Sequence, residues 1–540
     1  MAISRNDIFK WLGSGKAASV LRLATVVLVF LMFAAWLGTP DSLSNFAMVK
    51  LLAFFSAFLL TGTLYGLYGT KMFDVLCVLL LMWTCFETIT ALLQLFGALR
   101  SNNHFFAMTG TFDNPNPFAA LLSTGFCVLV YWQSRCSVRS VRVITVILLC
   151  LIFVILPATK CRGAFVGLVT GLAFTGLAWK NGWRTVFKKW CWLIVITLAA
   201  VSAFLYLWKK DSADGRLFLD RMCIVALAEK PLSGGGLGHC QERLAKTQMN
   251  WFGRYLEIEG GLPEIPDEKA EACRASGPVS YAFCDAFQIG LECGLPGMLV
   301  FIIVILLAIG RLLAIESPFA GGMIALAVTG LFSYTLCLWQ FGLLNAAFMG
   351  VASCDGSQRN LSWRTVFGIM VSVTPLIIVS PYATHMIRDW KAWNYVRPLY
   401  SSRDYGLYAD YCDGKSGKLG FCIEYMIEYG TALALSGNTE KSDSVLMEAY
   451  GFTGNQGFLI QLGNNSLERG DYMAAEDYYW KSFLSVPDRL MPLVCLANAY
   501  YQQADTARLK PMLGFIDSFH PQVETAATDD LRKQLESIRL

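Results

Sequence analysis

Charged residues are scarce in this sequence. Asp, Glu, Lys and Arg make up 16% of its 540 residues, against about 25% in typical soluble domains. The deficit lies in residues 1–395, where long apolar runs are separated by short polar links, and it excludes an ordinary soluble protein there. Residues 396–540 have the composition of a soluble protein. We therefore predict a membrane domain over 1–395 and a soluble helical domain over 396–540.

Metal-ligand spacings are missing as well. The 17 cysteines include no CxxC pair and no Cys/His cluster with zinc spacing, so we predict no metal site and no cofactor. Most cysteines lie in apolar runs, where they behave as small hydrophobic residues. Disulfides are feasible in the segments that we place outside the cytoplasm, and their pairing stays open for Cys240, Cys273, Cys284, Cys412 and Cys422. The net charge of +4 gives no reason to expect a nucleic-acid partner.

Long apolar runs are what the sequence has in abundance. A helix needs about 20 apolar residues to cross the hydrocarbon core. The first run is too long for a cleavable signal and no small-residue cleavage site follows it, so we expect it to be retained. The predicted spans are 18–37, 46–68, 72–97, 117–133, 142–158, 163–179, 190–208, 289–309, 321–339, 341–354 and 365–382. The run at 341–354 is short and also fits a re-entrant segment.

The lysines and arginines of the short loops gather on one side of these spans, and such loops face the cytoplasm. This places the N-terminus in the cytoplasm, and the 209–288 loop and the C-terminal domain on the opposite face. The basic side carries Lys10, Lys16, Lys71, Arg135, Arg139, Lys188, Arg311 and Arg359 among others. The short loops of the other side hold only Arg100, Lys160 and Arg162. Lys160 and Arg162 therefore need a reason other than topology.

Four segments on the predicted external face carry candidate functional residues. The first, residues 109–117, reads TGTFDNPNP, and its Gly, Asp, Asn and Pro residues predict a turn shaped by Asn114 and Asn116. A tight loop that starts a helix, with Pro117 near the first helical position, explains it equally well. The second, TKCRGA at 159–164, places Lys160 and Arg162 at a membrane boundary. Their side chains either extend to the lipid headgroups or bind a phosphate, to which an arginine can donate two parallel hydrogen bonds.

The third segment opens the long loop with DSADGRLFLDRMCIVALAEK at 211–230, which we predict to be an amphipathic helix at the interface with Arg216 and Arg221 on its polar side. A glycine run follows, and the amides of Gly236 and Gly238 are candidates to approach an anion. The run is not a P-loop, because the Lys-Ser/Thr ending is absent. His239, next to the run, is a weak candidate base.

The fourth segment, YAFCDAFQIGLE at 281–292, runs into the eighth span. Asp285, Gln288 and Glu292 share one helical face there and predict a water-filled entrance. A solvated helix end with acids that match the helix dipole is the alternative, which suits Asp285 better than Glu292.

In this order, the four segments resemble the O-antigen ligase and polymerase superfamily of bacterial membrane glycosyltransferases. TGTFDNPNPFAALL is similar to the family's G-T-F-x-N-P-N turn. TKCRGAFVGLVTG is similar to S-R-G-A, with Cys161 in place of serine. DGRLFLDRMCIVALAEKPLSGGGLG resembles the G-R…P-x-x-G-x-G-x-G loop, and YAFCDAFQIGLECGLPG resembles the segment that opens the next span. Where many members place a His-Asn pair, this chain has Phe283 and Cys284, which puts the family's histidine-dependent mechanism in doubt here.

The resemblance implies an inner-membrane enzyme of bacteria that transfers a glycan from a polyprenyl-diphosphate carrier to lipid A core or to a protein on the periplasmic face. It implies a transmembrane glycosyltransferase domain over 1–395 with a periplasmic loop at 209–288. Diphosphate binding by Lys160, Arg162, Arg216, Arg221, Gly236 and Gly238 follows from it. The catalytic candidates are Arg162, Arg216, Asp285 and Glu292. No metal is needed if cations neutralise the leaving diphosphate.

The C-terminal region resembles tetratricopeptide repeats. Leu462, Gly463, Gly470, Ala475, Tyr479 and Pro487 match consensus positions, and several of these recur at the 34-residue period. We predict a periplasmic α-solenoid that either docks a protein partner or only stabilises the fold.

Three alternatives stay open beside a ligase. Polymerisation of repeat units uses the same donor. A transporter would use ionisable residues inside the bilayer, of which Glu87 is the clearest, but the two halves show no internal symmetry. A scaffold without catalytic activity is the third.

Overall fold

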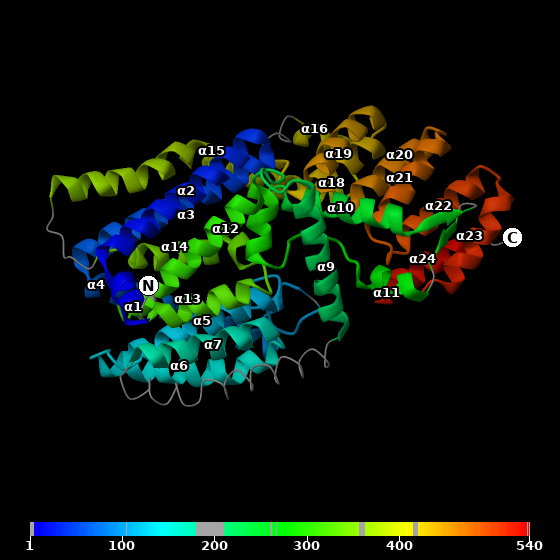
Figure 1. Cartoon of the computed structure of the whole chain (residues 1–540). Coiled ribbons are helices and arrows are strands. Elements are labelled where there is room, and N and C mark those ends of the chain that lie inside the picture. Colours follow the sequence, from blue (N-terminus) through cyan, green and yellow to red (C-terminus); the bar gives the residue numbers. More distant parts are fainter. Residues whose placement is uncertain are drawn as a thin grey trace.

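The computed structural model of the chain is almost entirely α-helical, which confirms the predicted all-α membrane bundle (Figure 1). It describes residues 5–103, 105–179, 210–259, 262–265, 267–355, 362–413, 419–536 and 538. Within these ranges the only strands are β1 (Glu257–Glu259) and β2 (Leu262–Glu264), a short antiparallel pair in the 209–288 loop.

Among the residues that the structure describes, six helices are long and apolar enough to cross a membrane. They are α2 (Gly15–Gly38), α3 (Ser42–Tyr68), α4 (Thr70–Leu95), α6 (Arg139–Ala158), α12 (Asp285–Ala314) and α15 (Trp363–Ser401). The helices α5 (Pro115–Gln133), α7 (Arg162–Trp179), α13 (Phe319–Gly330) and α14 (Trp339–Ala352) pack among them, and α1 (Arg5–Gly13) precedes them. The predicted span at 190–208 lies outside the described residues.

The predicted span at 321–339 is too long, because α13 ends at Gly330 and a loop with the turn η1 (Thr335–Cys337) follows it. At 1.5 Å per residue a 12-residue helix is roughly 18 Å long, which is shorter than the hydrocarbon core of about 30 Å. The loop at 331–338 instead brings polar groups to the start of α12.

Arg311, near the end of α12, fixes one end of the bundle. Its fully buried guanidinium donates hydrogen bonds to the carbonyl oxygens of Leu12 at 2.6 Å, Ser14 at 2.7 Å and Ala352 at 2.9 Å, and also to that of Cys354. The end of α14 therefore lies beside the end of α12, so α14 runs back through the bundle and the 341–354 segment is not re-entrant. We call this the basic end, and the end where α12 begins the loop end.

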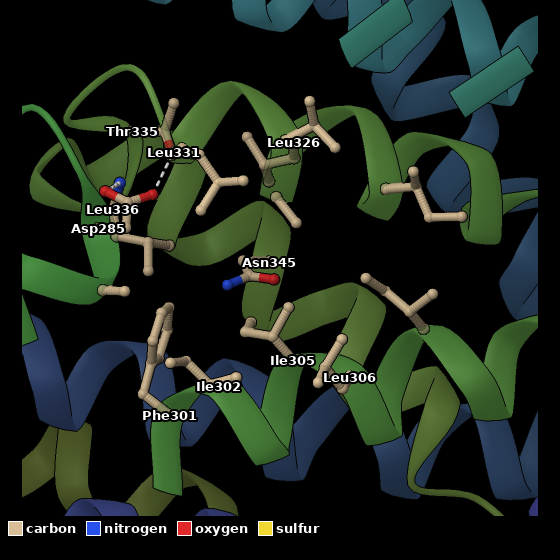
Figure 2. Close-up of a pocket in the computed structure, with 16 residues that line it drawn as sticks. Asp285, Phe301, Ile302, Ile305, Leu306, Leu326, Leu331, Thr335, Leu336 and Asn345 are labelled. Carbon is tan, nitrogen blue, oxygen red and sulfur yellow. Dashed lines mark hydrogen bonds between the residues drawn. The ribbon is translucent and has the colours of Figure 1, made fainter. Parts of the chain in front are cut away.

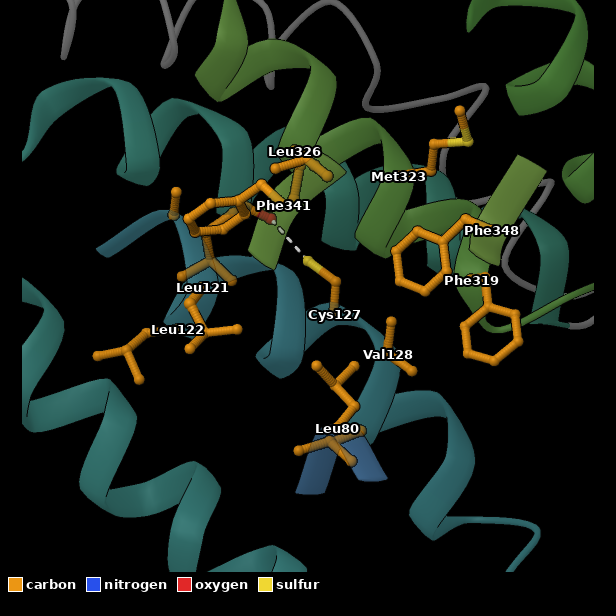
Figure 3. Packing of buried hydrophobic residues seen from close by; sticks show 14 of the residues in the cluster. Leu80, Leu121, Leu122, Cys127, Val128, Phe319, Met323, Leu326, Phe341 and Phe348 are labelled. Atoms are coloured by element: carbon orange, nitrogen blue, oxygen red, sulfur yellow. Dashed lines mark hydrogen bonds between the residues drawn. The ribbon is translucent and has the colours of Figure 1, made fainter. Parts of the chain in front are cut away.

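Small residues let the central helices approach closely. A Cβ atom on Gly167 of α7 would lie 2.6 Å from the carbonyl oxygen of Ala325 on α13. On α5, the thiol of Cys127 donates to the carbonyl oxygen of Leu168 at 3.7 Å (Figure 3). Contact through small residues is typical of membrane helices, where backbones pack without a hydrophobic driving force between them.

The helix α15 connects the bundle to the C-terminal helices at the right of Figure 1. It has 39 residues, or roughly 58 Å, and is unbroken through the predicted domain boundary at 395/396. Trp393, before that boundary, is buried with its ring 5.8 Å from Tyr425, so the last turns of α15 pack into the C-terminal core.

Three antiparallel hairpins follow the short helix α16 (Tyr405–Cys412). They are α18 (Ile423–Leu435) with α19 (Thr439–Thr453), α20 (Gln456–Glu468) with α21 (Tyr472–Ser485), and α22 (Met491–Gln502) with α23 (Thr506–Ser518), before a last helix α24 (Ala526–Glu536). The second helix of each hairpin is capped by the side chain of Asn438, Asp471 or Asp505. The helical hairpins agree with the predicted period, and the tetratricopeptide assignment stays a prediction.

The helices of the 209–288 loop are α9 (Lys210–Glu229), α10 (Cys240–Tyr255) and α11 (Asp267–Ala275). They share a hydrophobic core with the C-terminal helices, to which Met222 and Phe252 contribute on one side and Tyr479 and Phe483 on the other. Gln248 of α10 also donates a hydrogen bond to the carbonyl oxygen of Ser485 at 2.5 Å. The loop therefore forms one unit with the C-terminal helices, although the predicted boundaries assign it to the membrane domain.

Candidate functional site

The turn at 109–117 is held from α4. The side chain of Gln94 accepts hydrogen bonds from the backbone N–H groups of Thr109 at 2.9 Å and Gly110 at 3.0 Å. Asn114 caps α5, since its Oδ1 accepts from the backbone N–H of Asn116 at 2.9 Å. The first helical residue is Pro115, so Pro117 is the third, near the start of the helix as the tight-loop reading expects.

The four segments singled out in the sequence meet at the loop end. Arg162 is the first residue of α7, and Arg216 lies on α9 close to it. Burial lowers the pKa of the Arg216 guanidinium, and the positive charge of Arg162 lowers it further. Arginine keeps its charge under such shifts, so two cations lie near each other here. Lys160 is exposed at the joint before α7, with a left-handed backbone φ of 54°.

Arg221 does not join this pair. It lies five residues after Arg216 on the same helix, which turns its side chain by roughly 140° about the axis. Its exposed guanidinium lies over the ring of Trp251 on α10, 5.2 Å from the centroid. The structure therefore separates two arginines that the sequence places together.

An aromatic stack stands beside the cations. Tyr281 stacks on Tyr334 with 4.2 Å between ring centroids, and Phe283 meets Tyr334 edge-on at 5.2 Å. The guanidinium of Arg216 lies 5.9 Å from the Phe283 centroid. Burial raises the pKa of Tyr334, as do the negative charges of nearby groups, including Asp113 of the first turn. Tyr334 lies in the 331–338 loop, and the sequence analysis missed it because that loop was read as part of a span.

Asp285 begins α12 and is bound by the 331–338 loop (Figure 2). Its Oδ2 accepts from the hydroxyl of Thr335 at 2.5 Å, and its Oδ1 accepts from the backbone N–H of Leu336 at 3.1 Å. Both carboxylate oxygens are therefore engaged. Beside them, apolar side chains of α12 and α13, among them Phe301 and Leu326, line a cavity of about 240 Å³.

A second cavity, of about 300 Å³, holds the rest of the predicted polar stripe. Asp285, Gln288 and Glu292 all line it, as the helical spacing predicts. The side-chain amide of Gln288 donates to Oε1 of Glu292 at 2.6 Å. None of Lys160, Arg162 and Arg216 is among its lining residues, so these three cations lie outside the cavity that holds the carboxylates.

Lys50 of α3 is a further residue of this cavity that the sequence analysis missed. Its ammonium donates to the carbonyl oxygen of Cys337 at 3.0 Å and lies 4.6 Å from the centroid of the Phe46 ring. The available signal was an isolated lysine inside the apolar run 46–68, since a charge at membrane depth is a functional candidate by default.

The glycine run packs against a kink in α12. The backbone N–H groups of Gly235 and Gly236 donate to the carbonyl oxygens of Leu291 at 2.8 Å and Glu292 at 3.1 Å. Gly236 has a φ of 110°, and a Cβ atom there would meet the side chain of Thr39. The Gly236 amide is thus used within the fold, and Gly238 faces the Glu292 carboxylate through its own amide. Gly238 lines the second cavity, and neither glycine presents a free amide to an anion.

His239 is also engaged. Its Nε2 lies 2.8 Å from Oδ2 of Asp41, which caps α3. Burial opposes protonation of the ring, but the hydrogen bond and the charge of Asp41 outweigh it and raise the pKa of His239. The pair ties the glycine run to the turn between α2 and α3. Among the described residues, no group of three or more His, Cys, Asp or Glu side chains is placed to hold a metal ion.

The fold and the site define a polytopic α-helical membrane protein with charged and aromatic residues gathered at the loop end of its bundle. Residues 146–302 match the family model described as O-Antigen ligase, which confirms the resemblance to the O-antigen ligase superfamily and supports glycan transfer as the class of function. The match includes three of the four segments and leaves out the 109–117 turn. No curated protein and no solved structure shows significant similarity to the chain.

Proposed function

We propose that the protein is a ligase of the bacterial inner membrane that transfers a glycan from a polyprenyl-diphosphate carrier to lipid A core or a protein on the periplasmic face. The adjacency of Arg162 and Arg216 carries this proposal. Two cations held near each other attract an anion that can bind both, and the diphosphate of a lipid carrier supplies such an anion at the membrane boundary.

The chemistry follows from these positions. As the bond between the sugar and the diphosphate breaks, negative charge develops on the leaving oxygen. Arginines placed there in advance stabilise this charge without reorganisation. Lys160, exposed beside the pair, adds to the positive field. Cations alone provide the electrostatic stabilisation in this proposal, and no step is assigned to a metal.

The acceptor hydroxyl needs a base within hydrogen-bond reach. Both oxygens of Asp285 accept hydrogen bonds from the 331–338 loop, which favours a structural role for this residue. Glu292 lines the same second cavity as Asp285, but its side-chain donor, Gln288, belongs to its own helix and does not tie it to another element, so Glu292 is the better candidate base. It would take the place of the histidine that many family members have at Phe283.

The proposed orientation rests on the distribution of basic residues. Tyr131 donates a hydrogen bond to the carbonyl oxygen of Glu316 at 2.9 Å, which places Arg135, four residues further on, at the basic end with Arg311. Basic loops face the cytoplasm. The loop end would then be periplasmic, together with the 209–288 loop and the C-terminal helices, where we propose that acceptor or partner proteins dock.

Alanine substitutions of the two arginines test the function. We expect Arg162→Ala and Arg216→Ala each to abolish glycan attachment while the protein stays in the membrane, as measured on lipopolysaccharide ladders and glycoprotein profiles. Arg254→Ala, an exposed arginine of α10, is the matched control and should behave as wild type. Unchanged glycan profiles in both site variants would contradict the proposal. A single-repeat band after gene deletion would instead assign a polymerase.

A further inference from the structure

The cavity that contains Glu292 is built from several parts of the chain that are far apart in sequence. Phe46 and Lys50 of α3 line one side, and Gln288 and Glu292 of α12 line another. Phe421, just before α18 of the C-terminal region, closes it, and its ring stacks on Phe46 with 4.4 Å between centroids and 9° between planes. The C-terminal helices therefore complete a cavity whose other walls belong to the membrane bundle and to the loop that precedes α12.

The polar groups of the cavity suit a ligand with several hydroxyl groups. Lys50 supplies N–H donors, Glu292 supplies carboxylate oxygens, and Gln241 and Gln288 supply amides that both donate and accept. The stacked rings of Phe46 and Phe421 add apolar surface that C–H groups can contact. A pyranose ring combines these two requirements, since its edge carries hydroxyls and its faces carry C–H bonds.

The cavity is separate from the arginine pair but borders it. Tyr281 lines the cavity and stacks on Tyr334. Tyr334 in turn contacts the ring of Phe283, and the guanidinium of Arg216 lies over that ring. One aromatic stack thus has the cavity on one side and the cations on the other. Two substrates that react with each other need such neighbouring sites, with the bond to be formed at their border.

We propose that this cavity binds the sugar of the acceptor and that Lys50 and Phe421 determine its specificity. The inference rests on the proposed function and assigns the second of its two substrates. The acceptor hydroxyl attacks the anomeric carbon of the donor glycan, and its proton passes to the Glu292 carboxylate. The bond from that carbon to the diphosphate oxygen breaks, and its electron pair leaves with the lipid diphosphate beside Arg162 and Arg216.

The first experiment separates acceptor binding from donor binding in the full-length protein. Lys50→Met should lower glycan transfer about tenfold, the effect of losing one good polar contact. Its affinity for farnesyl diphosphate, a probe of the cation site, should stay unchanged, whereas Arg216→Ala should weaken it. Lys71→Met, which replaces an exposed lysine in the first turn of α4, is the matched control and should change neither quantity.

Loss of farnesyl diphosphate binding in Lys50→Met would overturn the inference, because the cavity would then belong to the donor site. Unchanged transfer in Lys50→Met would overturn it too. Failure of the proposed function looks different: wild-type protein would bind no farnesyl diphosphate, or Arg216→Ala would transfer glycan normally.

The second experiment tests the wall contributed by the C-terminal helices. Phe421→Ala should lower transfer to lipopolysaccharide about tenfold with donor binding intact, because an aromatic face is lost. Phe515→Ala, which removes a half-buried phenylalanine of α23, is the control and should keep wild-type transfer. Equal activity of the Phe421 and Phe515 variants would contradict the role of the wall. Glycan attached to protein and absent from lipopolysaccharide in the wild type would overturn the choice of a sugar acceptor.

Discussion

The carboxylate of Glu87 holds Thr111 in the turn before α5. Its Oε2 accepts from the backbone N–H of Thr111 at 2.8 Å, and its Oε1 accepts from the hydroxyl at 2.5 Å. An acid inside a membrane bundle is a common mark of a transport pathway. Both oxygens of this one are committed to a turn at the candidate site, so Glu87 supports the geometry of that site and not the transporter alternative.

We predict that Glu87→Ala releases this turn. Thr111 would lose two hydrogen bonds to a charged group, each worth about 1.5–3 kcal/mol, so the variant should unfold at a lower temperature in detergent and transfer less glycan. Glu87→Gln keeps one acceptor oxygen and should show a smaller loss of both. Thermal unfolding of the two purified variants checks the order, and equal stability of Glu87→Ala and wild type would contradict it.

The architecture could be predicted from the sequence to a large extent, since apolar runs of about 20 residues predict spanning helices. The predicted end of the 321–339 span was wrong, because the sequence stays apolar after the helix ends and composition therefore does not mark that end. The helix α13 ends at Gly330, which lies against the side chain of Asp285. The hydroxyl of Thr335 in the following loop donates its hydrogen bond to Asp285, which is 50 residues away in the sequence.

The candidate site could be predicted only in part, because it too depends on contacts between residues that are distant in sequence. Motif order indicated that Arg162, Arg216 and Asp285 share one face, but not which of them touch. Arg216 and Arg221 look equivalent in sequence, and only packing of α9 against α10 and α12 separates them. Lys50 and Phe421 reach one cavity from positions 371 residues apart, and such long-range contacts leave no local pattern in a single sequence.

The two arginines of α9 should therefore differ in effect. Arg216→Ala removes a cation of the proposed diphosphate site and should abolish transfer. Arg221→Ala loses a cation–π contact with Trp251 worth about 0.5–1 kcal/mol at an exposed site, and should retain transfer. Glycan profiles of cells that carry each variant at equal protein level decide this. Equal loss in both would place Arg221 in the site as well.

Arg311 should be the most sensitive position at the basic end. Arg311→Met would leave four backbone carbonyls in the bundle without their donor, and removal of one partner from a buried charged network costs about 3–5 kcal/mol. We expect little folded protein in the membrane. Arg139→Met, an exposed arginine near the same end, is the control for charge. Normal membrane levels of Arg311→Met would contradict the structural role.

Gly294 marks the kink where α12 meets the glycine run. Its φ is 75°, and a Cβ atom there would collide with the carbonyl oxygen of Leu232. Gly294→Ala should cost at least the penalty of about 1–2 kcal/mol for a left-handed backbone and should move the run away from Glu292. Gly277→Ala, where a Cβ atom meets nothing within 4 Å, should be tolerated. Stability and transfer of the two variants test this difference.

The pair of His239 and Asp41 should make stability depend on pH in a defined direction. Asp41 raises the pKa of His239 above 6.5, so the stability that protonated His239 adds is fully present below pH 6.5 and is lost as the pH rises through the raised value. The pKa of Asp41 is lowered below 3.8 in spite of its burial, because His239 and Ser44 outweigh that burial, so its part is lost only as the pH falls through that lower value.

His239→Gln should remove this pH dependence above pH 6.5 and should cost about 1.5–3 kcal/mol below it, the range for a hydrogen bond to a charged group. Thermal unfolding of both proteins at a series of pH values measures the difference. His520→Gln is the control, because this exposed histidine pairs with Glu524 at the surface of the C-terminal helices. Parallel pH profiles for His239→Gln and wild type would show that the pair does not hold the glycine run to the bundle.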